Sequence, residues 1–402
     1  MKILYISNLY FPDEIGGAEM YVRQIAEAVA TTESVSVIST TGFSWRRLFR
    51  ASIEQSNGVT IYRFYPLNIC SVHRLRELHP VLKPLWHLFD LYNWHARWMV
   101  SNILRRVQPD IVHTHNISGF SPSIFSGIRA AKKRIIHTLH DYHFLSPWSI
   151  LYRQNRIMDQ LTVPDRLYLG YYRRMTRGLD VVTAPSQFVI DQHRKYGFFP
   201  HSTCIKMPLG IDMPSTHISG SNEPPPTAKK YILYLGQITL YKGVRVLLEA
   251  FSKLPDGQER LIIAGVGPDM KQLQTEFSDP RIEWKGFVRG NDKLTILRQA
   301  YVSVVPSLWY DNSPVTIYES HAYGVPVIGS NIGGIPELVE NEKNGMLVRP
   351  GDVEDLQQKL SYIISHPETR DQLHHGALRS TADRSMPQHI HQLEQLYAQH
   401  LQ

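Results

Sequence analysis

Short runs of apolar residues alternate with longer amphipathic segments along most of this chain. In the first half the runs cover residues 2–7, 35–40, 60–65, 111–115, 134–139 and 180–186, and in the second half they cover residues 231–235, 261–264, 282–284, 301–305 and 325–330. Each run is too short for a helix and predicts a buried strand. Two successive series of strands and helices, with no sequence repeat between them, predict an α/β protein of two doubly wound, Rossmann-like domains facing a central cleft.

Three segments stand outside this alternation. Residues 85–107 repeat apolar positions at helical spacing and predict one long helix, whose other side carries Trp86 and Trp94 among arginines. Residues 213–229 contain four prolines and predict a linker. Residues 385–402 predict a polar helix with a narrow apolar stripe and three solvated histidines. The stripe consists of Ile390, Leu393, Leu396 and Tyr397, and the histidines are His389, His391 and His400.

The stretch from Pro306 to Val339 concentrates the candidate chemistry. One acid, Asp311, lies in a loop after a buried strand, and Ser313-Pro314 then predicts a helix start with Ser313 as the N-cap. A second acid, Glu319, lies in the second turn of that helix. Helix N-termini attract phosphate, and carboxylates accept hydrogen bonds from sugar hydroxyls. The combination favours a nucleotide-sugar site, although a plain βαβ unit with incidental surface acids explains either acid taken singly.

Further candidates follow other predicted strands. The pair Gly16-Gly17 is predicted to open a helix after the first strand. Two glycines there permit close approach of phosphate or sugar; the alternative is that they only form a tight strand-to-helix turn. Lys242-Gly243 places an ammonium group at the start of helix 244–252. His140 directly follows the predicted strand 134–139 and so lies at the edge where open α/β sheets bind ligands. The neighbouring histidines are interpreted as structural, because no Cys or Glu completes a ligand set with metal-site spacing.

Composition limits the class of protein. The 402 residues are 43% hydrophobic and 20% charged, which is ordinary for a globular chain of two domains. The cysteines, Cys70 and Cys204, are not in a CxxC motif, so we expect no disulfide framework and a reducing compartment. No uncharged apolar stretch is long enough to span a membrane, and the N-terminus reads as a strand rather than a signal peptide. We therefore expect a cytoplasmic protein.

The net charge of +7 is concentrated in the first half. Residues 1–200 hold 24 of the 43 Lys and Arg residues but 14 of the 36 acidic residues. Basic residues are interleaved with aromatic ones around Trp45-Arg46-Arg47 and again between Trp94 and Arg106, a pattern typical of the membrane interface. We expect peripheral binding to an anionic membrane on its inner face; the alternative is that the tryptophans pack under neighbouring loops. Nucleic acid would also attract this charge, but no recognised motif supports such a partner.

The spacing of the two acids resembles a known motif. Asp311 and Glu319 match the paired-acid motif (acid, seven residues, Glu) of retaining glycosyltransferases of the GT-B fold, in particular family 4, also called glycosyl transferases group 1. Three further segments are similar to that family: Gly-Gly-Ala-Glu at 16–19, Thr-Leu-His-Asp at 138–141 and Gly-Val-Gly-Pro at 265–268. The chain departs from the usual motif at two positions, with Asp311 in place of Glu and Gln237 in place of Arg.

The resemblance implies a domain plan and a reaction. Residues 1–205 would form the acceptor-side domain, residues 206–384 the nucleotide-sugar domain, and residues 385–402 a helix packing back on the N-terminal domain. The implied activity moves a hexose from a nucleotide-diphosphate sugar to a glycan or lipid-linked acceptor in polysaccharide synthesis, with UDP the first choice of nucleotide and GDP the second. No further cofactor is implied. The sequence contains no Asp-x-Asp, so we expect no metal at the diphosphate.

The resemblance also implies roles for single residues. Glu319 would accept hydrogen bonds from the ribose, while Lys242 and the backbone amides of Val315 and Thr316 would hold the diphosphate. The catalytic group would then be Asp311 and His140, which contact the transferred sugar, together with Lys242. The remaining donor-binding residues would be Gly16, Gly17 and Gln237.

Three other readings stay open from the sequence. A non-hydrolysing nucleotide-sugar epimerase shares the two-domain architecture and is separated by incubating a nucleotide sugar without an acceptor. A catalytically dead nucleotide-sugar-binding protein is compatible with the departures at Gln237 and Asp311. A nucleic-acid binder would show steeply salt-dependent binding to RNA or DNA.

Overall fold

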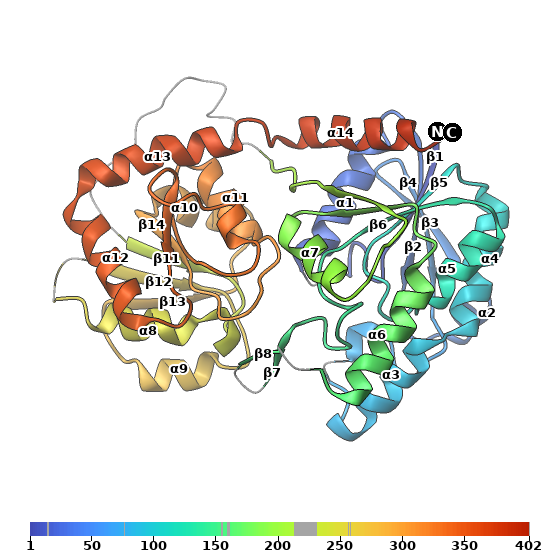
Figure 1. Ribbon diagram of the computed structural model, residues 1–402, viewed down its shortest axis with the longest axis horizontal. Helices are drawn as coiled ribbons and strands as arrows, with labels where there is room; N and C mark the ends of the chain where they lie inside the picture. The colour runs from blue at the N-terminus through green and yellow to red at the C-terminus, as the bar shows by residue number, and fades with distance from the viewer. Residues whose placement is uncertain are drawn as a thin grey trace. The chain divides into compact units, whose positions relative to one another are not determined.

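The fold is taken from a computed structural model of the chain (Figure 1). It describes residues 1–13, 16–75, 77–153, 156–158, 161–212, 231–255, 257 and 259–401, and the predicted linker 213–229 lies outside these residues. The chain divides into two compact units. The first comprises Met1–Ile150, Asp159–Leu209 and His389–Gln402, and the second comprises Leu151–Met158 and Gly210–Gln388.

The first unit is built on an eight-stranded sheet in the order β10-β9-β6-β5-β1-β2-β4-β3. All neighbours are parallel except the antiparallel pair of β3 and β4. The strands are β1 (Lys2–Ile6), β2 (Ser34–Thr40), β3 (Ser52–Ser56), β4 (Val59–Phe64), β5 (Ile111–Thr114), β6 (Arg134–Thr138), β9 (Val181–Ala184) and β10 (Thr203–Lys206). The sequence pattern predicted the buried parallel strands but missed β3, whose residues, SIEQS, are mostly polar and stand at the exposed edge.

Helices cover both faces of this sheet. They are α1 (Gly17–Val29), α2 (Trp45–Phe49), α3 (Lys83–Leu91), α4 (Trp94–Val107), α5 (Ser123–Ala130), α6 (Val163–Thr176), α7 (Gln187–Lys195) and α14 (Met386–Gln399), with 3-10 turns η1 (Val72–Arg74) and η2 (Pro80–Leu82). Successive side chains of a strand point to opposite faces of the sheet, so their contacts show which helix covers which face. His113 of β5 contacts Tyr397 of α14, whereas His137 of β6 contacts Phe125 of α5 on the opposite face.

The predicted long helix 85–107 is wrong, because it is two helices. The break falls at Tyr92-Asn93, where the Asn93 side chain accepts a hydrogen bond from the Ala96 amide and so caps α4. In α3 the predicted faces are also reversed. Trp86 is fully buried and donates its indole N–H to the Cys70 carbonyl, while Leu88 on the predicted core side is exposed.

The C-terminal helix α14 buries the predicted stripe, since Ile390, Leu393, Leu396 and Tyr397 are all buried. Residues 389–401 belong to the first unit, where the Tyr397 and Tyr5 hydroxyls lie 2.9 Å apart. The expectation of a solvated His389 is wrong. It is only 3% exposed, and its Nε2 lies 2.7 Å from the Tyr21 hydroxyl.

The second unit has a parallel six-stranded sheet in the order β13-β12-β11-β14-β15-β16. Its strands are β11 (Tyr231–Leu235), β12 (Arg260–Ala264), β13 (Ile282–Gly286), β14 (Val302–Val305), β15 (Val327–Ser330) and β16 (Gly345–Val348). A small hairpin of β7 (Tyr152–Arg153) and β8 (Arg156–Ile157) also belongs to this unit.

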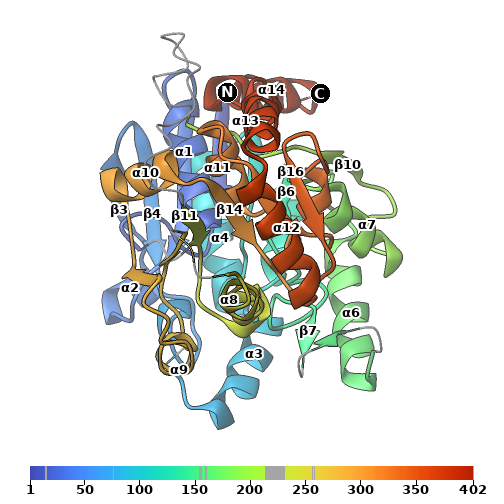
Figure 2. The same ribbon diagram turned by 90° about the vertical axis from the view of Figure 1, so that its left-hand side faces the viewer.

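The helices of the second unit form a layer on each face of its sheet, as Figures 1 and 2 show. They are α8 (Val244–Ser252), α9 (Met270–Glu276), α10 (Gly290–Gln299), α11 (Val315–Ala322), α12 (Val353–Ser365) and α13 (Pro367–Thr381), with 3-10 turns η4 (Leu240–Lys242) and η5 (Ile335–Glu337). Leu247, Leu273 and Leu356 bring α8, α9 and α12 to one apolar core. Leu297 of α10 lies in the core on the opposite face.

The order of strands creates a switch point in each sheet. From β1 the chain proceeds to β2 on one side and later returns to β5 on the other; from β11 it proceeds to β12 and later returns to β14. Loops leaving such a pair of strands diverge, and ligands of open α/β sheets bind in the resulting crevice at the carboxyl ends. The candidate residues after β1, β11 and β14 therefore lie at the two positions that the fold favours for binding.

Candidate functional site

In the second unit, Lys242 and Asp311 meet at the switch point. The Lys242 ammonium lies 2.6 Å from Oδ2 of Asp311, and the Ser307 hydroxyl donates to the same oxygen at 2.9 Å. Asp311 is only 6% exposed, whereas Lys242 is half-buried. The ammonium also lies 5.0 Å from the ring centre of Trp309, a cation–π contact. These two contacts fix the orientation of the Asp311 carboxylate, and the ammonium keeps further donors for a second anion.

Two glycines in the left-handed conformation hold this pair in place. Gly243 (φ +75°) follows Lys242, and a Cβ atom there would lie 1.8 Å from the Pro306 carbonyl oxygen. Gly333 (φ +64°) packs so closely that a Cβ atom would lie 2.4 Å from the Asp311 carbonyl oxygen. Only glycine accepts both the backbone conformation and the close approach. The loops after β11, β14 and β15 are thereby fixed against one another.

Helix α11 presents its N-terminus at the same edge. It begins at Val315 with Pro314 as the N-cap, so the predicted Ser313 cap is wrong; the Ser313 hydroxyl instead lies 2.8 Å from the Tyr318 hydroxyl. The amides of Val315 and Thr316 are in the first turn, where no intrahelical carbonyl is available to them. The Thr316 hydroxyl donates to the Leu235 carbonyl at the end of β11. Such an N-terminus favours an anion.

Glu319 lies one turn further along α11 and is half-buried. Its Oε1 accepts a hydrogen bond of 2.6 Å from the ammonium of Lys293 in α10. Lys293 was not among the residues predicted from the sequence. Its distance of 26 positions from Glu319 gives no periodic signal, so tertiary packing alone brings the two together.

Gln237 follows β11 and contacts an aromatic cluster. Its Oε1 lies 3.2 Å from the hydroxyl of Tyr241, which donates to it. The Tyr241 ring contacts Trp309 on one side, with ring centres 5.7 Å apart, and Tyr152 of the β7–β8 hairpin on the other, at 6.4 Å. This hydrogen bond to Oε1 leaves the N–H donors of the Gln237 amide group unused by Tyr241. The sequence did not predict this cluster, because nothing in the spacing of residues 152, 241 and 309 connects them.

In the first unit, Gly16 and Gly17 are exposed at the start of α1. Gly16 is the N-cap, and its amide donates to Oε2 of Glu19 at 2.8 Å. The other oxygen of Glu19 accepts from the Asn116 side chain, which follows β5, at 3.3 Å. The loop that leaves β1 is thus tied to the loop that leaves β5, on the two sides of the switch point.

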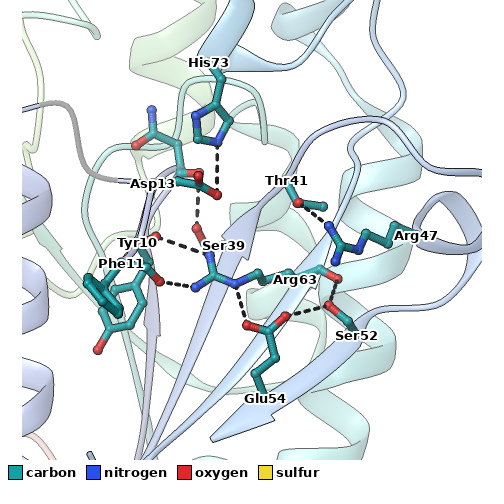
Figure 3. A network of polar contacts seen from close by, with 11 residues as sticks. Tyr10, Phe11, Asp13, Ser39, Thr41, Arg47, Ser52, Glu54, Arg63 and His73 are labelled. Carbon is teal, nitrogen blue, oxygen red and sulfur yellow. Dashed lines mark hydrogen bonds and ion pairs between the residues drawn. The ribbon is translucent and has the colours of Figure 1, made fainter. Parts of the chain in front are cut away.

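A buried arginine fastens the beginning of the β1–α1 loop (Figure 3). Arg63 of β4 donates to the carbonyl oxygens of Tyr10 and Phe11 and pairs with Glu54 of β3 at 3.2 Å. It is 3% exposed, and a buried guanidinium held by three acceptors is costly to disturb. Asp13, further along the loop, lies 3.7 Å from His73 of η1. The edge strand β3, absent from the sequence-based prediction, therefore supports the loop that leads to Gly16.

His140 stands just beyond β6 and is half-buried. Its Nε2 lies 2.9 Å from Nδ1 of His115, and its ring contacts the edge of Tyr21. His113 and His115 share one strand face, as predicted, with ring centres 4.2 Å apart, and His137 faces the other way. Burial lowers the pKa of His140 to about 4 and that of His113 to about 3. These imidazoles are therefore neutral near pH 7, and His140 is a hydrogen-bonding group rather than a cation.

Within the described residues, no three or more His, Cys, Asp or Glu side chains are grouped so as to hold a metal ion. Cys70 and Cys204 are free thiols. The same part of the chain contains no helix with the length and apolar character needed to cross a membrane.

Comparison with known families decides the class of protein. A model described as Glycosyltransferase Family 4 matches residues 15–213, and a model described as Glycosyl transferases group 1 matches residues 219–379. The chain belongs to the family 4 glycosyltransferases. The two matches cover both units and together span most of the sequence.

Two relatives are similar to this glycosyltransferase over different shares of its length. A 42.6 kDa protein in the cps region of Klebsiella pneumoniae is 28% identical over 84% of this chain and 87% of its own length. The putative colanic acid biosynthesis glycosyltransferase WcaL of Escherichia coli is 29% identical over 48% of this chain and 50% of its own.

Solved structures establish the fold as GT-B. Sucrose-phosphate synthase from Thermosynechococcus elongatus superposes with a TM-score of 0.74 at 21% identity, over 99% of this chain and 98% of that one. HepE of Anabaena, solved in complex with UDP, gives a TM-score of 0.71 at 18% identity, over 99% and 100% of the two chains. The expected α/β architecture of two Rossmann-like domains is confirmed by these neighbours and by the two parallel sheets.

Proposed function

We propose that this glycosyltransferase transfers a hexose, with retention of anomeric configuration, from a UDP sugar to a glycan or lipid-linked acceptor in polysaccharide synthesis; GDP is the second choice of nucleotide. The observation that carries the proposal is the group at the β11/β14 switch point, where Lys242, Asp311 and the start of α11 lie together and Glu319 follows one turn later. The UDP complexes of HepE and the polysaccharide context of WcaL support the choices of donor and product.

The proposed step needs no nucleophile from the protein. The bond between the sugar C1 and the diphosphate oxygen breaks, the acceptor oxygen bonds to C1 from the same face, and the leaving phosphate oxygen takes the acceptor proton. Lys242 and the amides of Val315 and Thr316 stabilise the charge that grows on the diphosphate, so that no metal is required. Gln237 donates a further hydrogen bond from its amide group.

Asp311 and His140 are assigned to the transferred sugar. Asp311 is held by Lys242 and Ser307, so its carboxylate is an oriented acceptor for sugar hydroxyls. His140 is neutral, because burial lowers its pKa, so it can lie against the sugar without adding a positive charge. Gly16 and Gly17 leave room for close approach at the start of α1.

We also propose that α2, α3 and α4 bind an anionic membrane surface. Helices α2 and α4 are neighbours, since His95 lies against the Leu48 carbonyl oxygen. Their exposed aromatic and apolar side chains, together with those of α3, are Trp45, Phe49, Leu85, Leu88, Phe89, Trp94 and Trp98. Exposed Arg46, Arg50, Arg105 and Arg106 accompany them. From residue 78 to 109 Asp90 is the only acid in the sequence, and it is buried. Large exposed apolar groups beside unopposed cations suit anionic headgroups.

The donor assignment is tested with Glu319→Ala. This variant should lose binding of UDP and UDP sugars by calorimetry, whereas Asp311→Ala should bind free UDP and fail to transfer sugar. Wild-type affinity for UDP and GDP in Glu319→Ala would overturn the assignment. Epimer formation from a nucleotide sugar without any acceptor would instead identify an epimerase.

A further inference from the structure

The ion pair between Lys293 and Glu319 has features that stability alone does not explain. Lys293 is at the fourth position of α10, and the positive end of a helix disfavours a cation there. Its side chain is 24% exposed and that of Glu319 is 26% exposed. A partly exposed Lys–Glu pair of this kind contributes at most about 1 kcal/mol to folding. The pair therefore stabilises the fold little and places a lysine where its helix does not favour it.

The contact orients the Glu319 carboxylate. Lys293 occupies Oε1, and Oε2 accepts no hydrogen bond from any residue in the described part of the chain. A carboxylate offers four lone-pair positions, so most of its accepting capacity is still available. The side chain of an unpaired glutamate samples several rotamers, and fixing it before a ligand arrives lowers the entropic cost of binding.

We propose that Lys293 is a positioning residue for the donor, which holds Glu319 in the one orientation that accepts both ribose hydroxyls. This inference rests on the proposed function, in which Glu319 binds the ribose. Lys293 itself acts through Glu319, while the diphosphate is bound by Lys242 and the start of α11. Recognition of the ribose therefore depends on α10 as well as on α11, and the chain from 290 to 299 contributes to donor selection.

The test uses Lys293→Met and Lys293→Arg in the full chain, with Lys253→Met as the matched control. Lys253, the residue directly after α8, forms an ion pair with Glu354 of α12 and so offers the same type of contact between two other helices. Calorimetry measures binding of UDP, 2′-deoxy-UDP and 3′-deoxy-UDP, and steady-state kinetics are measured with the UDP sugar that the wild type uses. Thermal melting checks that each variant is folded.

We expect Lys293→Met to raise KM for the donor about tenfold with kcat within about twofold, because ground-state and transition-state binding of the ribose fall together. Lys293→Arg should restore most of the affinity, and Lys253→Met should behave as wild type. The deoxy analogues should bind the wild type much more weakly than UDP does, and this difference should shrink in Lys293→Met. In a Glu319→Gln background, Lys293→Met should have no further effect.

Three results of the binding measurements would contradict the proposals. Equal UDP affinity in wild type and Lys293→Met overturns the positioning role and leaves the proposed function intact. An equal loss of affinity for UDP and its deoxy analogues also overturns it, because Lys293 would then act on the phosphates or the base. Failure of the wild-type chain to bind UDP or GDP refutes the proposed function itself.

Discussion

Lys242 and Asp311, 69 positions apart in the sequence, form an ion pair of 2.6 Å at the carboxyl end of the second sheet. The sequence suggested separate contacts for them, one with phosphate and one with sugar. The structure joins them, so that each orients the other. The charge of Lys242 is partly balanced before any donor binds, and the N-terminus of α11 supplies additional positive potential for a diphosphate.

Breaking this pair should separate binding from transfer. Asp311→Asn keeps the shape of the side chain but removes the charge that holds Lys242, so we expect sugar transfer to fall by about 100-fold or more, as for loss of a preorganised polar group. The affinity for free UDP should change by less than about threefold, since Asp311 does not contact the nucleotide in the proposed site. Ser307→Ala, which removes only the second hydrogen bond to Oδ2, serves as the mild control. Wild-type turnover by Asp311→Asn would contradict the sugar-contact role.

The Tyr241 hydroxyl is expected to matter through Gln237. Tyr241→Phe removes the hydrogen bond that fixes the Gln237 amide, and a loss of about 1 kcal/mol corresponds to a roughly fivefold increase in donor KM. In a Gln237→Ala background the same substitution should have no effect. A fivefold loss that persists without Gln237 would show that Tyr241 acts on the donor directly. Steady-state kinetics of the four proteins measure the coupling.

Membrane binding is expected to depend on apolar side chains and cations of the first unit together. Replacing Trp45, Phe49, Leu88 and Phe89 with Ser should release the protein from vesicles containing phosphatidylglycerol, and so should reversing Arg46, Arg50, Arg105 and Arg106 to Glu. Cosedimentation measures the bound fraction. The control is Tyr362→Ser, which removes an exposed aromatic ring of the second unit. Unchanged sedimentation of both fourfold variants would refute the membrane surface.

The buried histidines predict a loss of stability in mild acid. Burial lowers the pKa of His389 to about 4, below that of an unfolded histidine, so the unfolded state binds the extra proton first. The contribution of neutral, buried His389 to the free energy of unfolding is complete above about pH 6.5. It is lost as the pH falls towards 4, at about 1.4 kcal/mol per unit of pKa difference between the folded and unfolded states. His389→Gln removes one such group. Between pH 7.5 and 5.5 the variant should lose about 1 kcal/mol less of its unfolding free energy than the wild type, as measured by urea denaturation.

A parallel loss in His389→Gln and wild type would contradict that assignment. His391→Gln is the matched control, because His391 lies on the same helix and is exposed. The histidines of the first unit that face the same interior, among them His113 and His140, should produce the remaining dependence on pH.

The sequence by itself determined the architecture and most of the candidate residues. Buried parallel strands read as short apolar runs, and glycines and polar residues mark their carboxyl ends, so β11, β14 and the loops that carry Lys242 and Asp311 were predicted correctly. The apolar stripe of α14 was predicted as well, because a helical period of 3.6 is visible in a single segment.

Only the tertiary structure decided which residues meet. The pairing of Lys293 with Glu319 and the ring contacts of Tyr241 with Trp309 and Tyr152 join segments that no local period relates. Packing likewise overrode the apparent pattern in α3, where Trp86 is buried and Leu88 is exposed. It did so again at His389, which is buried and lies 2.7 Å from the Tyr21 hydroxyl. Hydrophobic periodicity identifies a face of one element, but the partner of that face is set by strand order and by loops, and these are properties of the whole chain.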